Sequence, residues 1–125
     1  MGLLGGLFGN ASEVNAERVE QELQQFLIDG ERIEHAFTLI RDMIIFSNKR
    51  VIMIDKQGYT GKKKEYVSIP YGSIVRYSME STGSFDIDAE IKLWVRSQAE
   101  PIELEFRRDK SVVDVYRVLS KYILN

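Results

Sequence analysis

The feature that most constrains this chain is a strict alternation of apolar and other residues between Phe85 and Val95. Successive side chains of a β-strand point to opposite faces, whereas a helix repeats every 3.6 residues. Apolar residues at every second position over this stretch therefore predict a long strand with one buried face. The opposite face carries charged residues and one tryptophan: Asp86, Asp88, Glu90, Lys92, Trp94 and Arg96.

Further segments have the composition of strands and are separated by turn-forming residues. Residues 47–49 predict a tight turn that joins two of these strands as a hairpin, and residues 56–61 predict a loop. Together with the long strand, these segments bring the expected number of strands to about seven. The other expected strands lie within residues 33–39, 43–46, 51–54, 66–69, 74–79 and 102–106.

Helical periodicity occurs near both ends of the chain. A helix is predicted over residues 13–28, with Ser12 as its N-cap and Asp29-Gly30 after its end. A second is predicted from Ser111, which forms a variant capping box with Asp114, to the C-terminus. The expected apolar faces are Val19, Leu23, Phe26 and Leu27 in the first helix, and Val112, Val115, Tyr116, Leu119, Tyr122 and Ile123 in the second.

The length of 125 residues corresponds to about one domain. We divide the chain into a flexible apolar tip, residues 1–12, and a single domain over residues 13–125. The predicted class is mainly β (α+β). An antiparallel set of short strands with a terminal amphipathic helix predicts either two near-orthogonal sheets or a partly open barrel, whose open end the helix would cap.

Four segments, taken in order, resemble the bacterial pleckstrin-homology (PH) domain family. They are SNKRVIMIDKQG (47–58), GKKKEY (61–66), SIPYGSI (68–74) and ESTGSFDIDAEIKLWV (80–95). The resemblance implies a PH-like barrel, a non-enzymatic role and members that can self-associate into ring-like oligomers. The helix predicted over residues 13–28 is extra to such a barrel. It implies no catalytic residues. Phosphoinositide binding is not carried over, because the connection at Arg41-Asp42 is short and nearly neutral.

Composition excludes several classes of function. The chain has no cysteine and one histidine, His35, so thiol chemistry and sites that need two imidazoles are excluded. His35 alternates with apolar residues and is interpreted as a core or boundary residue. The net charge of −2 argues against a nucleic-acid partner. We expect no enzyme activity, no metal and no cofactor. Because no stretch is apolar enough to span a membrane, we expect a cytoplasmic protein.

Charge is segregated along the chain. Residues 1–30 hold five acids and one base, residues 49–64 hold six bases and one acid, and residues 80–105 hold seven acids and two bases. The basic stretch is either a solvated loop or a patch for an anionic ligand, a membrane surface or an acidic partner. Self-recognition between basic and acidic segments of two copies is a third interpretation. The candidate patch is Lys49, Arg50, Lys56, Lys62, Lys63 and Lys64.

The remaining candidates are contacts with another subunit or a protein partner. Asp86, Asp88 and Glu90 share a strand face, which cannot by itself surround a calcium ion, so a solvated face or a protein contact is expected. Trp94 is either covered by a neighbouring element, such as the first helix, or an interface anchor. The N-terminal tip is either a frayed tail, an apolar contact between subunits or a membrane contact. Its apolar residues are Leu3, Leu4, Leu7 and Phe8.

Overall fold

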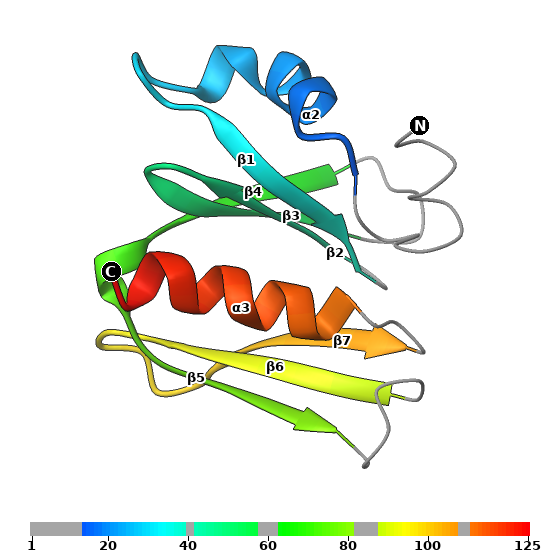
Figure 1. Cartoon of the computed structure of the whole chain (residues 1–125), viewed down its shortest axis with the longest axis vertical. Helices are drawn as coiled ribbons and strands as arrows, with labels where there is room; N and C mark the ends of the chain where they lie inside the picture. The colour runs from blue at the N-terminus through cyan, green and yellow to red at the C-terminus, as the bar shows by residue number, and fades with distance from the viewer. Residues whose placement is uncertain (1–13, 40–41, 58–62, 82–87, 108–110) are drawn as a thin grey trace. The chain divides into compact units, whose positions relative to one another are not determined.

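A computed structural model of the chain describes residues 14–39, 42–57, 63–81, 88–107 and 111–125 (Figure 1). The chain divides into two compact units, Met1–Ile69 and Pro70–Asn125, which are considered in turn. Among the described residues, no helix is long and apolar enough to cross a membrane.

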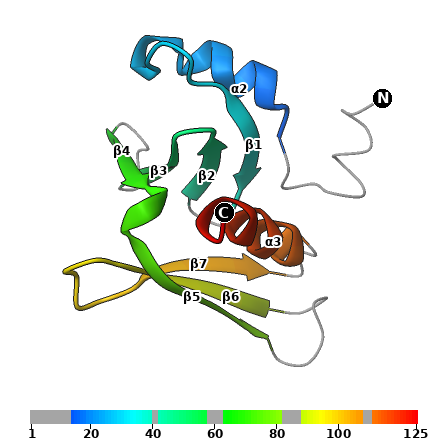
Figure 2. The ribbon, with the colours of Figure 1, turned by 60° about the vertical axis from the view of Figure 1, so that its left-hand side comes forward.

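The first unit is a four-stranded sheet covered on one face by a short helix. Neighbouring strands follow chain order, β1-β2-β3-β4, so β1 and β4 form the two edges. Figure 2 shows these two strands at opposite sides of the sheet, with α2 above it. The elements are α2 (Ala16–Glu22), the 3-10 turn η1 (Gln24–Phe26), β1 (Ile33–Thr38), β2 (Asp42–Ser47), β3 (Arg50–Gln57) and β4 (Lys63–Pro70).

The helix is held on the sheet by apolar packing. Val19 of α2 and Leu23, which directly follows the helix, are buried and form one cluster with residues of the first three strands, namely Ile33, Ala36, Ile45 and Ile52. Burial of such side chains contributes about 1.5–3 kcal/mol each. The sheet therefore holds α2 in place, since seven residues are too few to form a stable helix alone.

The first helix is shorter than the predicted span of residues 13–28. Its N-cap is Asn15, whose Oδ1 accepts a 3.0 Å hydrogen bond from the Arg18 N–H, while the predicted cap, Ser12, lies outside the described residues. The α-helix ends at Glu22, and η1 follows as a tighter turn. Gly30 then reverses the chain with φ of 82°, a conformation that glycine adopts without strain.

The second unit is a three-stranded sheet in the order β5-β6-β7 with the C-terminal helix packed on it. The buried face of the predicted long strand is confirmed over the described part, where Ala89, Ile91 and Leu93 are buried. Val112, Val115 and Leu119 of the helix are buried as well. The elements are η2 (Tyr71–Ser73), β5 (Ile74–Ser81), β6 (Asp88–Val95), β7 (Ile102–Arg107) and α3 (Ser111–Ile123).

The predicted fold class is confirmed. The described residues form seven strands in two antiparallel sheets, with a helix before the first sheet and a helix after the second. The hairpin predicted at residues 47–49 joins β2 and β3. One boundary differs, because β3 continues to Gln57 and so includes Lys56, which the sequence placed in a loop.

A β-bulge in β1 changes the face on which His35 lies. Ile33 is opposite Ser47, but His35 is opposite Phe46, so β1 contains one extra residue at this point. As a result, Ile33 no longer shares a face with His35: it joins the cluster under α2. The His35 ring is half-buried and stacks on Phe37 at 6.5 Å.

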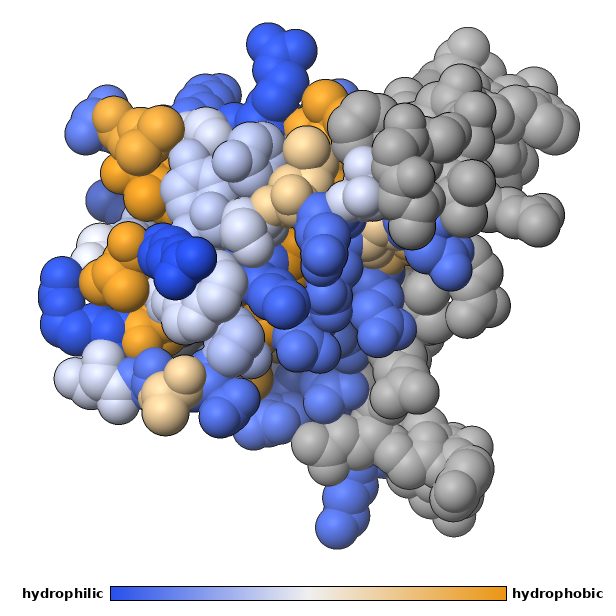
Figure 3. All heavy atoms as spheres, turned by 90° about the horizontal axis from the view of Figure 1, so that it is seen from below, coloured by the Kyte–Doolittle hydropathy of each residue, from blue (hydrophilic) through white to orange (hydrophobic). Residues whose placement is uncertain are grey.

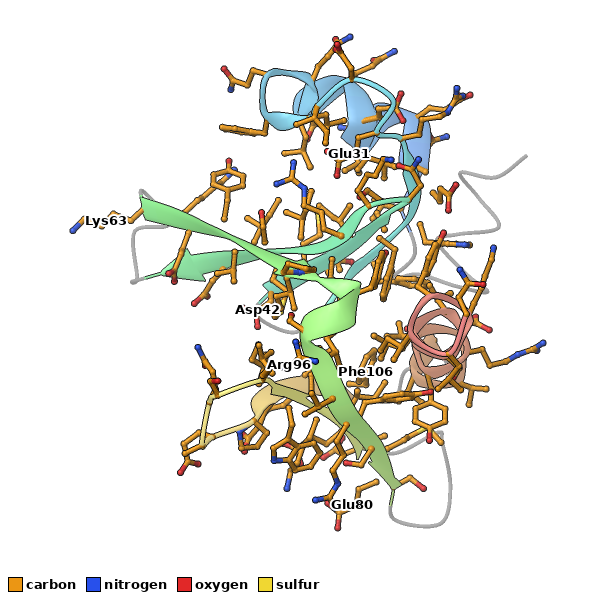
Figure 4. All side chains as sticks on the ribbon, turned by 90° about the vertical axis from the view of Figure 1, so that its left-hand side faces the viewer. Glu31, Asp42, Lys63, Glu80, Arg96 and Phe106 are labelled. Atoms are coloured by element: carbon orange, nitrogen blue, oxygen red, sulfur yellow. The ribbon has the colours of Figure 1, made fainter. Side chains whose placement is uncertain are left out.

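A buried ion pair joins the chain after α2 to the sheet. The Arg50 guanidinium donates from Nε to Glu31 Oε2 at 2.9 Å and from Nη2 to Oε1 at 3.0 Å. The Glu31 side chain is fully buried, while about a quarter of the Arg50 side chain is exposed. Ser47 Oγ donates to the same carboxylate at 2.6 Å, and the Ile28 N–H donates at 3.2 Å. Figure 4 shows Glu31 beneath α2.

Arg50 also reaches two other segments. Its Nη2 donates to the Phe26 carbonyl oxygen and its Nη1 to Ser68 Oγ, both at 2.9 Å. Burial by itself raises the pKa of Glu31, but the hydrogen bonds from Arg50, Ser47 and Ile28 outweigh it and hold the pKa below 4.5. The pair therefore connects η1, the following loop and β4 through one charged group at the start of β3.

We predict that Glu31→Ala lowers the free energy of unfolding by about 3 kcal/mol, because it leaves the Arg50 charge without its partner in a mostly buried position. Chemical denaturation at pH 7 measures this loss. Arg18→Ala is the matched control: Arg18 and Glu22 form an exposed pair at 3.7 Å, and its loss costs at most about 0.5 kcal/mol. Equal effects of the two substitutions would contradict the role given to Glu31.

The same pair predicts a dependence on pH. Because folding lowers the pKa of Glu31, its contribution to stability is present above pH 4.5 and is lost as the pH falls through the pKa of the folded state. The stability difference between the natural chain and Glu31→Gln should therefore shrink on acidification from pH 6 to 3. A difference that stays constant over this range would contradict the prediction.

Candidate interaction surfaces

The predicted basic patch is divided by the structure. Lys49 is exposed in the turn before β3, whereas Lys63 and Lys64 are exposed at the start of β4. Arg50 contacts Ser68, which is five residues beyond Lys63 and thus about 17 Å farther along the strand. Figure 4 shows the Lys63 side chain directed away from the sheet. Lys62 and the side chain of Lys56 lie outside the described part of the chain.

The guanidinium of Arg50, another residue of the predicted patch, is engaged within the unit. Every one of its three nitrogen atoms donates to Glu31, Ser68 or the Phe26 carbonyl oxygen. Local sequence patterns do not reveal this pair, because its two residues are nineteen positions apart. The basic candidates that remain described and exposed are Lys49, Lys63 and Lys64.

An exposed apolar patch lies beside the lysines of β4. Phe26 is 46% exposed, Ile28 61% and Tyr66 43%, and the rings of Phe26 and Tyr66 are 4.9 Å apart between centroids. Lys64, Tyr66 and Ser68 share one face of β4, since strand side chains alternate. We call Phe26, Ile28 and Tyr66 the Phe26 patch. The sequence analysis missed it because helical spacing assigned Phe26 to a buried helix face.

The outer face of the second sheet carries a row of carboxylates. Cα partners place Glu80 of β5 opposite Glu90 of β6, and Glu90 opposite Glu105 of β7. In the next row, Lys92 lies opposite Glu103. Figure 3 views the molecule from below and shows hydrophilic side chains over much of its described surface, and Figure 4 shows Glu80 near the end of β5. This arrangement makes the face acidic.

Glu90 is the central residue of that row. Partial burial, together with the charges of Glu103, Glu80 and Glu105, raises its pKa above 4.5, and Lys92 opposes the shift. Of the other predicted contacts on this face, Asp88 is exposed, and Asp86 lies outside the described residues. Within the described residues, no group of three or more acidic or histidine side chains is arranged to hold a metal ion.

Trp94 lies on the same outer face and is half-buried. Its cross-strand partner is Arg76, whose Cζ is 4.4 Å from the centroid of the indole ring. Such a cation–π contact contributes about 0.5–1 kcal/mol at an exposed site. Next to Arg76, the bulge residue Val75 is 57% exposed. The neighbour that the structure gives Trp94 is thus an arginine of the adjacent strand.

The N-terminal contacts predicted for Leu3, Leu4, Leu7 and Phe8 lie outside the described residues. The chain is described from Val14, whose N–H donates to the Ala36 carbonyl oxygen of β1 at 2.9 Å. The described part of the chain therefore begins beside β1, at one edge of the sheet.

Comparison with known proteins gives consistent results. The family model described as "Bacterial PH domain" matches residues 2–123. YjqA of Bacillus subtilis, an uncharacterized protein, is 47% identical over 121 residues, which cover 96% of this chain and 97% of YjqA.

Two solved structures are similar over most of their length. A crystal structure of a pleckstrin homology domain from Shewanella amazonensis has a TM-score of 0.85 at 45% identity, covering 98% of this chain and 99% of that one. A protein with a pleckstrin-homology domain from Shewanella loihica has a TM-score of 0.79 at 42% identity, with 90% and 96% covered.

We predict that Glu90→Gln raises the free energy of unfolding at pH 7 by about 0.5 kcal/mol, because like charges directly opposite each other destabilise a sheet. Because folding raises the pKa of Glu90, the destabilising effect of its charge is present at neutral pH and absent below pH 4.5, where the carboxyl group is protonated. The gain in stability from Glu90→Gln should therefore disappear on acidification. Chemical denaturation at pH 7 and pH 4 measures both effects. Glu100→Gln, in the exposed loop before β7, is the control. An unchanged stability of Glu90→Gln at pH 7 would refute the repulsion.

Proposed function

The chain belongs to the bacterial PH domain family, and from this premise we propose that it is a non-enzymatic interaction domain that assembles into a homo-oligomer. A ring is one closed form of such an assembly. The assembled domain acts in the cytoplasm as a scaffold or adaptor that binds a protein partner.

The observation that carries this proposal is the difference between the two edges of the first sheet. The β1 edge is covered: the Val14 N–H bonds the Ala36 carbonyl oxygen, and Glu20 Oε1 accepts a 2.8 Å hydrogen bond from the Ile33 N–H. The β4 edge carries exposed side chains from Lys63 to Tyr66. An exposed edge strand is a template on which another chain can pair, and monomeric proteins usually protect it.

Charge supports the same proposal. Lys63 and Lys64 are exposed at the start of β4, and the outer face of the β5–β7 sheet presents Glu80, Glu90 and Glu105. Complementary charges on two surfaces of one chain favour association of copies and fix their orientation. Lysines on an edge strand also oppose unspecific strand pairing, so a partner needs matching acidic groups.

We predict that the purified protein is larger than a monomer at micromolar concentration, as measured by light scattering. Replacing Lys62, Lys63 and Lys64 with Glu should weaken assembly about tenfold or more, because the charges at the edge are reversed. Lys49→Glu is the control, since it changes an exposed lysine in the turn before β3, away from Lys63 and Lys64. A natural chain that is monomeric under these conditions would overturn the proposal.

A second candidate function is binding to an anionic surface. The specific observation is that Lys64 shares a face of β4 with Tyr66, which contacts Phe26, so a cation and two exposed rings lie together. Lysines near an anionic membrane contribute about 1 kcal/mol each. The fraction of protein that sediments with vesicles containing phosphatidylserine should then decrease when salt is added. It should also decrease when Lys62, Lys63 and Lys64 are replaced with Glu. Binding that depends on neither salt nor anionic lipid would count against this function.

A further inference from the structure

The Phe26 patch is held in place from below by the buried ion pair. Arg50 donates to the Phe26 carbonyl oxygen and to Ser68, which shares its strand face with Tyr66. The Ile28 N–H donates to Glu31, the partner of Arg50. Both the turn that carries Phe26 and Ile28 and the strand that carries Tyr66 are thus fixed to one group. A preorganised apolar surface loses little conformational entropy when another chain covers it.

The N-terminal tip has the composition to cover such a surface. Residues 1–12 contain no charged side chain and include three leucines and one phenylalanine: Leu3, Leu4, Leu7 and Phe8. The thirteen residues before Val14 span roughly 43 Å when fully extended. The tip is therefore long enough to reach a surface well beyond the edge at which it joins the sheet.

The position of the tip favours a second copy over the patch of the same chain. The tip joins at the β1 edge through Val14, whereas Tyr66 of the patch lies on β4, about 14 Å away across four strands. Figure 2 shows β1 and β4 at opposite sides of the sheet, with α2 above it. The exposed surface of α2 is polar and includes Glu17, Arg18, Gln21 and Glu22. A tip that folded back would lay its leucines across these side chains.

We propose that the N-terminal tip of one copy docks on the Phe26 patch of the next copy. The donor and acceptor are different surfaces, so the contact is head-to-tail, and repetition gives a ring if the rotation closes and a filament if it does not. This inference rests on the proposed self-assembly and names its apolar contact. The lysines of β4 flank the same acceptor surface.

Two complementary variants test the inference. The first lacks residues 2–12 and keeps the patch. The second keeps the tip and carries Ile28→Gln with Tyr66→Gln, which replace exposed apolar side chains without adding charge. The matched control carries Val75→Gln with Leu124→Gln, which are 57% and 71% exposed in the second unit. Circular dichroism and thermal melts establish that all variants are folded.

Sedimentation velocity at micromolar concentration should show the natural chain and the control as oligomers and each test variant with about tenfold or more weaker assembly. A mixture of the two test variants should form one-to-one pairs and nothing larger, because the tip of the second variant has one intact patch to occupy. Oligomers of the tip-deleted variant, or a mixture that stays monomeric, would overturn the inference while leaving self-assembly itself standing.

If the natural chain is monomeric, the proposed self-assembly fails, and the contact is then tested alone. A synthetic peptide of residues 1–13 is titrated into the tip-deleted protein, with tyrosine fluorescence as the readout. Saturable binding that Ile28→Gln with Tyr66→Gln weakens about tenfold or more supports the tip–patch contact. Absence of peptide binding at millimolar concentration overturns the contact. The same holds if deletion of the tip abolishes binding to vesicles while the peptide still fails to bind the patch, because the tip then contacts a membrane.

Discussion

The ion pair between Glu31 and Arg50 is the interaction on which the first unit depends. It brings η1, the loop after it, the β2–β3 turn and β4 to one charged group, with Ser47 and Ser68 completing the hydrogen bonds. A buried pair of this kind adds little net stability over an apolar core, but the loss of either partner leaves a charge unpaired. Its main effect is therefore to define one position for the turn that carries Phe26.

The sequence predicted the buried faces of regular elements, which local periodicity determines. It missed the position of Phe26, which depends on the ion pair between Glu31 and Arg50. The buried faces of β6 and α3 were predicted because the two elements pack against each other, each through one face. Apolar residues therefore repeat every two residues in β6 and every 3.6 residues in α3. The end of the first helix has no such signal. The helix stops at Glu22 and tightens into η1, so Phe26 leaves the buried face on which regular helical spacing placed it. Its carbonyl oxygen is instead bound by Arg50, a contact between residues 24 positions apart.

Among the candidate residues, long-range pairing again decided the outcome. Arg50 belonged to a basic stretch of the sequence, yet its guanidinium is paired with the buried Glu31 carboxylate. Trp94 interrupted a charged strand face, and the register of β5 against β6 supplies the arginine that covers its ring. Neither partner is adjacent in sequence, and register is set by the whole sheet rather than by the residues concerned.

The asymmetry of the two sheet edges constrains any assembly of this chain. In an isologous contact through this edge, a two-fold axis makes the two β4 strands antiparallel, and where that axis lies at Lys63 and Lys64 these residues of one copy face the same lysines of the other. That juxtaposition is repulsive, as like charges opposite each other are in any sheet. A contact between unlike surfaces avoids it, because an apolar segment without charge, or an acidic sheet face, meets the lysines instead. The distribution of charge thus disfavours a symmetric dimer whose two-fold axis passes through Lys63 and Lys64, and a head-to-tail contact avoids this arrangement.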